Sequence, residues 1–270
     1  GVAVCSLGHC HPAITEIICA QAKTLLHCSN HYEIGAQRQL ADKLTGLSGM
    51  QRVFFSNSGA EANEAAIKIA RLYASRRKIK NPSIIVMEGA FHGRTLATLT
   101  ATGNRKIQAG FEPLVQGFLR APYGDLDALE TIAKNSAEVV AVLVEPVQGE
   151  GGVIVPDPQY LREIRALCDR QGWLLILDEI QTGLCRTGKW FAYQHYGIEP
   201  DLMTLAKSLG NGVPIGAFVV NRKIKEEVLI PGTHASTYGG NPLVTAAALA
   251  VFKAIEKGKE PFAAAVLPKA

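Results

Sequence analysis

The chain lacks the long apolar runs, paired cysteines and aromatic-rich basic patches that mark several protein classes. No apolar stretch approaches the roughly 18 residues that cross a bilayer, so we expect no membrane-spanning helix in this sequence. Its first seven residues include no basic residue, which predicts no secretory signal at its start. In the dense basic cluster at 71–80, no aromatic residue interleaves with Arg76, Arg77, Lys78 and Lys80 for base stacking. We read that cluster as a solvated helix end and expect no nucleic-acid partner.

Cysteines are present, but no two of them are spaced as C-x-x-C. A zinc site built from Cys5, His9, Cys10 and His11 is conceivable, yet this spacing matches no zinc template, and we expect no metal. Free, mostly buried thiols in a reducing compartment are the better interpretation. This predicts a cytoplasmic location.

What remains is the composition of one globular domain. A length of 270 residues with 47% hydrophobic content is enough to bury a sizeable core, and a net charge of +4 is mild. We find neither internal repeats nor low-complexity segments.

Short apolar runs alternate with amphipathic stretches along the chain. Strands are expected at 52–55, 84–87, 139–144, 174–177, 202–204 and 217–220. Helices are expected at 12–26, 32–47, 61–78, 125–135, 158–171 and 242–256. The alternation predicts an α/β fold with a mainly parallel sheet flanked by helices.

Two of the expected strands each lead to a charged residue. The run at 174–177 is followed by Asp178, and the run at 202–204 leads to Lys207. Open α/β sheets place their ligands at the carboxyl ends of their strands. An acid and a lysine so placed suit pyridoxal phosphate, whose aldehyde would form a Schiff base with Lys207 while Asp178 pairs with the ring nitrogen. Taken alone, the two residues are more simply explained as an ion pair or two solvated strand ends.

A third segment adds a candidate anion site. The strand at 52–55 is followed by the small-residue turn 56–60 and by a helix with acidic residues in its first turn. The N-terminus of a helix offers unpaired backbone amides and the positive end of its dipole, and both favour a phosphate. The alternative is that Ser58 merely caps the helix.

Together with further motifs, these segments resemble the class III aminotransferases, which are pyridoxal phosphate enzymes. The motifs are Phe-Phe-Ser-Asn-Ser-Gly-Ala-Glu-Ala-Asn-Glu-Ala at 54–65, Phe-His-Gly-Arg-Thr at 91–95, Glu-Pro-Val-Gln-Gly-Glu-Gly-Gly at 145–152, the Asp178 and Lys207 segments, and Ser-Thr-Tyr-Gly-Gly-Asn-Pro-Leu at 236–243. As an ordered set they cover nearly the whole chain and are specific. The resemblance implies the large domain of a fold-type I pyridoxal phosphate transferase.

The resemblance also implies a role for individual residues. Lys207 and Asp178 are the implied catalytic pair. The implied cofactor-binding residues are Ser58, Gly59, Ala60, Phe91, His92, Glu145, Asp178, Gln181, Lys207 and Thr237. Phe91 would stack on the cofactor ring, with a plain core phenylalanine as the alternative. Thr237 would reach the phosphate from the neighbouring subunit, which implies a homodimer with a shared active site.

The implied reaction is a transamination between a small amino donor and 2-oxoglutarate. Arg94 would clamp a substrate carboxylate, and Glu150 would pair with an arginine of the family's C-terminal region. Lys207 would act as general base once its pKa is lowered by burial and nearby positive charge.

The chain looks most similar to the acetylornithine aminotransferases within the family. This likeness implies transfer of the terminal amino group of N-acetylornithine to 2-oxoglutarate in arginine biosynthesis. The alternatives are an ornithine or other ω-amino acid aminotransferase, a 2,1-aminomutase, and a truncated non-catalytic fragment.

Both ends look cut relative to the family. Residues 1–257 are expected to form the cofactor-binding large domain, with the tail of an N-terminal segment at 1–30, and 258–270 a short divergent tail. An N-terminal arm and a small C-terminal domain are therefore expected to be missing, which predicts poor turnover with 2-oxoglutarate. Cys185 and Asn211 stand where the family favours glycine; the second change should be mild, because asparagine tolerates left-handed backbone angles.

Overall fold

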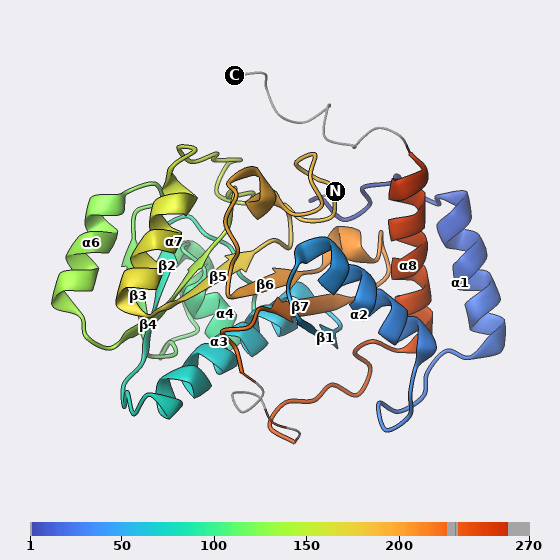
Figure 1. The fold of residues 1–270 in the computed structure, drawn as a ribbon, viewed down its shortest axis with the longest axis horizontal. Coiled ribbons are helices and arrows are strands. Elements are labelled where there is room, and N and C mark those ends of the chain that lie inside the picture. The colour runs from blue at the N-terminus through green and yellow to red at the C-terminus, as the bar shows by residue number, and fades with distance from the viewer. Residues whose placement is uncertain (1, 226–229, 231, 259–270) are drawn as a thin grey trace.

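Seven strands form one sheet through the middle of the molecule (Figure 1). The computed structural model describes residues 2–225, 230 and 232–258. The strands are β1 (Arg52–Ser56), β2 (Ser83–Met87), β3 (Phe118–Ala121), β4 (Val139–Val144), β5 (Leu174–Asp178), β6 (Leu202–Leu205) and β7 (Gly216–Val220). Their order across the sheet is β1-β7-β6-β5-β4-β2-β3.

The sheet is mainly parallel, as the sequence predicts. The pairs β2–β3, β2–β4, β4–β5 and β5–β6 are parallel, whereas β7 runs antiparallel to both β6 and β1. Strands β1, β2, β4, β5 and β6 therefore all end at the same edge of the sheet. We call this the carboxyl edge, and the loops that follow these strands meet there.

Helices cover both faces of the sheet. They are α1 (Pro12–Thr24), α2 (Gly35–Ser48), α3 (Gly59–Arg76), α4 (Leu96–Ala101), α5 (Arg105–Gln108), α6 (Leu126–Asn135), α7 (Tyr160–Gln171) and α8 (Pro242–Lys257), with short 3-10 turns at Ala192–His195 and Lys207–Leu209. Helix α3 packs its alanines and isoleucines on one face, and α2, α6, α7 and α8 pack on the other (Figure 1). Helix α1 packs against α8, where Ile14 and Val251 belong to the same buried apolar cluster.

The strand interiors show why the sheet is central. All six residues of β4 and all five of β5 are buried, since helices cover both faces of the sheet, and all of these residues except Asp178 are apolar. The expected elements miss β3, α4 and α5, which have only four to six residues each. The tail expected at 258–270 lies outside the described residues apart from Gly258, and the domain division stays a prediction.

Cys185 and Asn211, the two departures that the sequence comparison with the family suggests, adopt left-handed backbone angles. Cys185 has φ 62° and Asn211 has φ 47°. Such angles cost a non-glycine residue roughly 1–2 kcal/mol, and asparagine least. The Cys185 side chain is buried in a cluster with Ile14 and Val251, which offsets part of this cost.

Candidate functional site

A cavity of about 240 Å³ lies at the carboxyl edge of the sheet. Its lining comes from loops that follow β1, β2, β4, β5 and β6, and consists of Gly59, Ala60, Phe91, His92, Gly93, Arg94, Glu145, Asp178, Ile180, Gln181 and Lys207. The structure thus brings together most of the residues that the sequence singles out as site residues by their chemistry or by resemblance. Ser58, Glu150 and Thr237 lie outside this cavity.

Asp178 is the most firmly held group of the site. It ends β5, is 3% exposed, and its Oδ2 accepts hydrogen bonds from Asn63 Nδ2 and His92 Nδ1, both at 2.8 Å. Its Oδ1 accepts from the Ile180 backbone N–H at 3.1 Å. Because a carboxylate only accepts, the proton of this pair lies on His92 Nδ1. These contacts fix the carboxylate at the floor of the cavity.

Lys207 enters the cavity from the turn after β6. Its backbone is left-handed, with φ 46°, and its side chain is half-buried. Burial lowers the pKa of the Lys207 amine, while Asp178, Glu150 and Glu145 act in the opposite direction. The charged groups of the chain that act on the Lys207 amine are thus all acidic. The prediction that nearby positive charge lowers its pKa is therefore wrong for the protein chain itself. Burial is the cause of the lowered pKa.

The N-terminus of α3 forms one wall of the cavity through Gly59 and Ala60. Ser58 caps this helix, since its hydroxyl accepts from the Glu61 backbone N–H at 3.2 Å. The capping alternative is therefore observed, and contact of Ser58 with a phosphate stays a prediction. A Cβ added to Gly59 would lie 2.6 Å from Ile180 Cδ1, so a larger residue here would require the Ile180 side chain to move.

Phe91 and Glu145 are joined by a hydrogen bond beside Asp178. The Phe91 backbone N–H donates to Glu145 Oε2 at 3.1 Å. Glu145 is buried, which raises its pKa to about 7, with His92 lowering it and Asp178 raising it further. The Arg94 guanidinium is exposed and lies 5.7 Å from the centre of the Phe91 ring. The aromatic ring and the cation therefore lie next to each other in the cavity lining.

Gln181 packs against the backbone of the loop after β4. A Cβ added to Gly149 would lie 2.3 Å from Gln181 Oε1, so the end of the Gln181 side chain occupies the space beside this glycine. Glu150 is exposed and lines a neighbouring cleft of about 700 Å³, which shares Phe91 and Arg94 with the first cavity. The two hollows thus meet at Arg94.

Thr237 lies on the surface, outside the cavity of its own chain. The preceding Ser236 accepts from Asn57 Nδ2 at 3.3 Å through its hydroxyl and from Asn30 Nδ2 at 3.0 Å through its carbonyl. The role of Thr237 in a neighbouring subunit stays a prediction.

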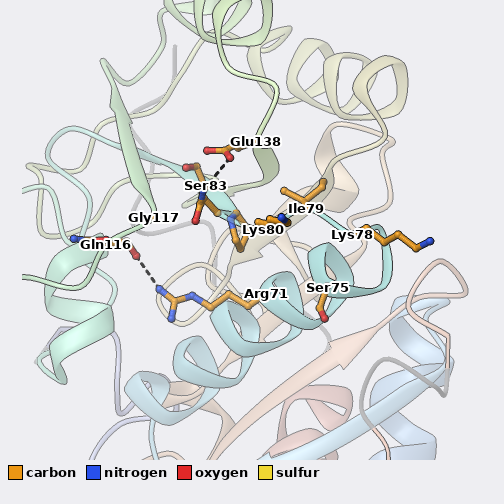
Figure 2. Close-up of a pocket in the computed structure, with 11 residues that line it drawn as sticks. Arg71, Ser75, Lys78, Ile79, Lys80, Ser83, Gln116, Gly117 and Glu138 are labelled. Carbon is orange, nitrogen blue, oxygen red and sulfur yellow. Dashed lines mark hydrogen bonds between the residues drawn. The ribbon is translucent and has the colours of Figure 1, made fainter.

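A separate cavity of about 690 Å³ lies at the opposite edge of the sheet, near the start of β2 and β4 (Figure 2). Arg71, Lys78 and Lys80 line it from the end of α3 and the residues that follow. Arg71 donates to the Gln116 carbonyl at 2.8 Å, and the Ser83 backbone N–H donates to the Glu138 carbonyl at 2.9 Å (Figure 2). This cavity therefore lies at the other end of the strands from Lys207 and Asp178.

The cysteines are less buried than the sequence suggests. All six are unpaired; Cys168 and Cys185 are buried, Cys5 and Cys28 half-buried, and Cys10 and Cys19 exposed. The described residues contain no cluster of three or more potential metal ligands. None of the helices in the described part of the chain has the length and apolarity to traverse a bilayer.

Sequence reasoning missed Asn63 and Glu179. Asn63 is fully buried on α3 and donates to Asp178 and, at 2.8 Å, to the His92 carbonyl. An asparagine among the buried alanines of this helix was the available signal. Glu179 is buried behind the cavity, where its carboxylate accepts from the backbone N–H groups of Ala192 and Tyr193 at 2.7 and 2.8 Å. Burial raises the pKa of Glu179 to about 7.

Comparison with protein families gives a match over residues 1–266 to the family described as Aminotransferase class-III. The chain is 60% identical to the acetylornithine aminotransferase of Nitrosomonas europaea, over 95% of this chain and 65% of that protein. It is 52% identical to the acetylornithine aminotransferase of Methanocaldococcus jannaschii, over 95% of this chain and 64% of the relative. The chain therefore spans just under two thirds of the length of these relatives.

Solved structures that superpose on this chain are also those of aminotransferases. The ornithine aminotransferase of Toxoplasma gondii superposes with a TM-score of 0.92 at 39% identity, over 96% of this chain and 62% of that one. The acetylornithine aminotransferase of Elizabethkingia anophelis gives a TM-score of 0.82 at 36% identity, over 96% of this chain and 62% of that one. A further structure of the Toxoplasma enzyme is described with partial occupancy of pyridoxal phosphate at its active site.

Proposed function

Because the chain belongs to the class III aminotransferase family, whose members depend on pyridoxal phosphate, we propose that it carries the cofactor site of an aminotransferase. The observation that carries this proposal is the meeting of Lys207, Asp178 and the start of α3 in one cavity. A basic amine, an acid and a phosphate seat are the three contacts that this cofactor requires.

The residues present fit the cofactor. The cavity is slightly smaller than the roughly 300–1,000 Å³ of typical ligand pockets, which suits a compact aromatic molecule. Gly59 and Ala60 would hold the phosphate with their backbone amides at the N-terminus of an 18-residue helix. Phe91 would cover one face of the ring, and Asp178 would pair with the ring nitrogen.

The bound cofactor supplies an aldehyde that takes up the donor's amine and a ring that withdraws electrons from the reacting carbon. Lys207 moves the proton: its half-buried amine has a lowered pKa, so a larger share of it is neutral and able to accept a proton near pH 7. Asp178, fixed by Asn63, His92 and Ile180, keeps its negative charge directed at the cavity. Gln181 and Glu145 border the same space and keep it narrow.

For the reaction, we propose transfer of the terminal amino group of N-acetylornithine to 2-oxoglutarate, as a step of arginine biosynthesis. The names of the closely similar relatives support this donor. The exposed Arg94, which lies between the cofactor cavity and the neighbouring cleft, suits a clamp on the donor's α-carboxylate. An ornithine aminotransferase is the second candidate, because structures of such enzymes share this fold.

A homodimer is part of the proposal. Thr237 is exposed and lies outside its own cavity, where it is available to a second subunit. Val153, Ile154 and Val155 are consecutive and exposed by 44–61%, an apolar surface of the kind that partners cover. We also place the protein in the cytoplasm, since its six cysteines are unpaired.

The donor is tested by single-turnover spectroscopy of the chain loaded with pyridoxal phosphate. We expect N-acetylornithine to convert the bound cofactor faster than free ornithine or 4-aminobutyrate, and Arg94→Ala to slow this conversion at least about tenfold through loss of a bidentate contact. Arg162→Ala, on the distant helix α7, is the control. Preference for ornithine or 4-aminobutyrate would overturn the assigned donor.

A further inference from the structure

The turn that carries Lys207 is attached to the N-terminal segment formed by residues 3–8. Four backbone or side-chain groups of that segment are hydrogen-bonded to Ser208 and Asn211, which follow Lys207 in the same turn. The two segments lie about two hundred positions apart in sequence, so these contacts are tertiary. We call residues 3–8 the strap.

Asn211 makes two of these contacts with opposite ends of one amide. Its Oδ1 accepts from the Leu7 backbone N–H at 2.9 Å, and its Nδ2 donates to the Gly8 carbonyl at 3.2 Å. Its own carbonyl lies 3.9 Å from Cys5 Sγ, a weak contact. A glycine at position 211 would allow the backbone angle but form neither side-chain bond.

Ser208 makes the second attachment through a relay of hydroxyls. Its Oγ donates to the Ala3 carbonyl at 2.8 Å and accepts from the Ser6 hydroxyl. The Ser6 hydroxyl in turn accepts from Arg186 Nη2. Ser208 is 2% exposed, so these bonds are shielded from water.

The Lys207 backbone gives the strap its importance. Lys207 has a left-handed φ of 46°, which is costly for a residue with a long side chain and persists only where the surroundings enforce it. Asn211, four residues on, has a left-handed φ of 47°. The strap contacts lie on residues 208 and 211, directly beside and beyond Lys207, so they restrain the turn that aims its amine.

We propose that the strap is a positioning element for Lys207, with Asn211 as its main anchor. The proposal rests on the proposed function only in assigning Lys207 its task; the restraint itself is a property of the cofactor-free chain. A strap that holds the turn keeps the amine inside the cavity and away from water. Loosening it hydrates the amine.

The positions of the charged groups around Lys207 allow a change in the burial of its amine to be distinguished from a change in its neighbouring charges. Asp178, Glu145 and Glu150 are the acids that act on it, and none belongs to the strap. Among the described residues, the ionisable side chains hydrogen-bonded to the strap or the turn are Cys5, which belongs to the strap, and Arg186, which bonds Ser6 rather than Lys207. Releasing the strap therefore changes the burial of the amine and leaves its acidic neighbours in place.

The test uses the 270-residue chain without cofactor and compares Asn211→Gly with the control Asn135→Gly. Asn135 is exposed at the end of α6, where it bonds only its own helix. Two quantities are measured: amide hydrogen exchange at Leu7, and the pH profile of Lys207 acetylation by trace acetic anhydride, read by peptide mass spectrometry. Circular dichroism verifies that each variant folds.

We expect Asn211→Gly to speed exchange at Leu7 at least about tenfold and to move the apparent pKa of Lys207 upward by about half a unit or more. Ser6→Ala, which breaks the relay without touching the turn's backbone, should shift Lys207 in the same direction by less. Asn135→Gly should change neither quantity. Faster exchange at Leu7 with an unchanged Lys207 profile in both variants would show a merely structural contact and overturn the proposal, as would unchanged exchange. A failure of the cofactor assignment would leave these two measurements unaffected.

Discussion

Asp178 is held by donors from three parts of the chain, and this arrangement makes its carboxylate a fixed charge. Asn63 comes from α3, His92 from the loop after β2, and the Ile180 N–H from the loop after β5. Two donors converge on Oδ2 and one on Oδ1, so the side chain has little freedom to turn. An experiment on Asp178 should therefore remove the negative charge of its side chain and keep the shape.

We expect Asp178→Asn to keep pyridoxal phosphate bound but to slow conversion by an amino donor about 10²–10⁴-fold, because the neutral amide no longer stabilises a protonated ring nitrogen. Rapid-mixing absorbance with N-acetylornithine measures the rate. Asp169→Asn, an exposed carboxylate on α7, serves as the matched control. A near-normal rate for Asp178→Asn would show that the carboxylate is only structural.

Among single residues, those with distinctive chemistry were predictable from the sequence. The residues that hydrogen-bond to them and hold them in place were not. Lys207 and Asp178 stand out because each is a charged residue at or just beyond the end of an apolar strand. Asn63 supports Asp178 from another element, and this contact depends on how α3 packs over β5. Glu150 and Ser58 belong to motifs that also supply residues of the cavity, but neither of them lines it. Glu150 lies in the neighbouring cleft, and Ser58 caps helix α3.

Among the elements, α3 matters most because its start is both a packed contact and a wall of the cavity. Gly59 begins the helix, and a carbon atom added to it would meet the Ile180 side chain at 2.6 Å. The long, strongly periodic helices and buried strands were predictable to within about three residues at each end. The missed β3 is an edge strand of four residues, and α4 and α5 have too few turns to show periodicity.

We expect Gly59→Ala to lower the free energy of unfolding by about 1–3 kcal/mol and to weaken binding of pyridoxal phosphate, since the added methyl group forces Ile180 aside. The control is Gly46→Ala in α2, where the new Cβ meets no atom within 4 Å. That change should stabilise the protein by up to about 1 kcal/mol. Urea unfolding and cofactor titration measure the two effects; equal behaviour of both variants would contradict the packing account.

For the whole molecule, the carboxyl edge concentrates buried acids, and this makes stability depend on pH. Glu145 and Glu179 both have pKa values raised by burial from 4.5 to about 7. Between these values the folded state holds protons that the unfolded chain has lost. The free energy of unfolding therefore falls as pH rises through this window, by up to about 1.4 kcal/mol per pH unit for each group.

We expect Glu179→Gln to flatten this fall, because the amide does not ionise, and Glu163→Gln on the exposed face of α7 to leave it unchanged. Urea unfolding across the same window gives the slopes. The amide that replaces the Glu179 carboxylate still accepts one of the two backbone N–H groups at Ala192 and Tyr193, so the variant is expected to fold with reduced stability. An unaltered slope in Glu179→Gln would contradict the raised pKa.

The overall architecture was predictable as a class and not as a topology. Alternating strands and helices indicate a mainly parallel sheet, but no local pattern places β7 antiparallel between β1 and β6. That placement leaves one strand, β7, between β1 and β6, and the start of α3 then lines the same cavity as Asp178 and Lys207. Attachment of the N-terminal strap to the Lys207 turn is likewise a long-range contact, which appears only once the chain is folded.

The central claim is that Lys207 is the residue that binds pyridoxal phosphate covalently, and borohydride reduction of the loaded chain followed by peptide mapping tests it most directly. We expect the reduced cofactor on the peptide that contains Lys207, and no label in Lys207→Ala. Label on Lys68, Lys189 or Lys253 instead, or undiminished labelling of Lys207→Ala, would contradict the account.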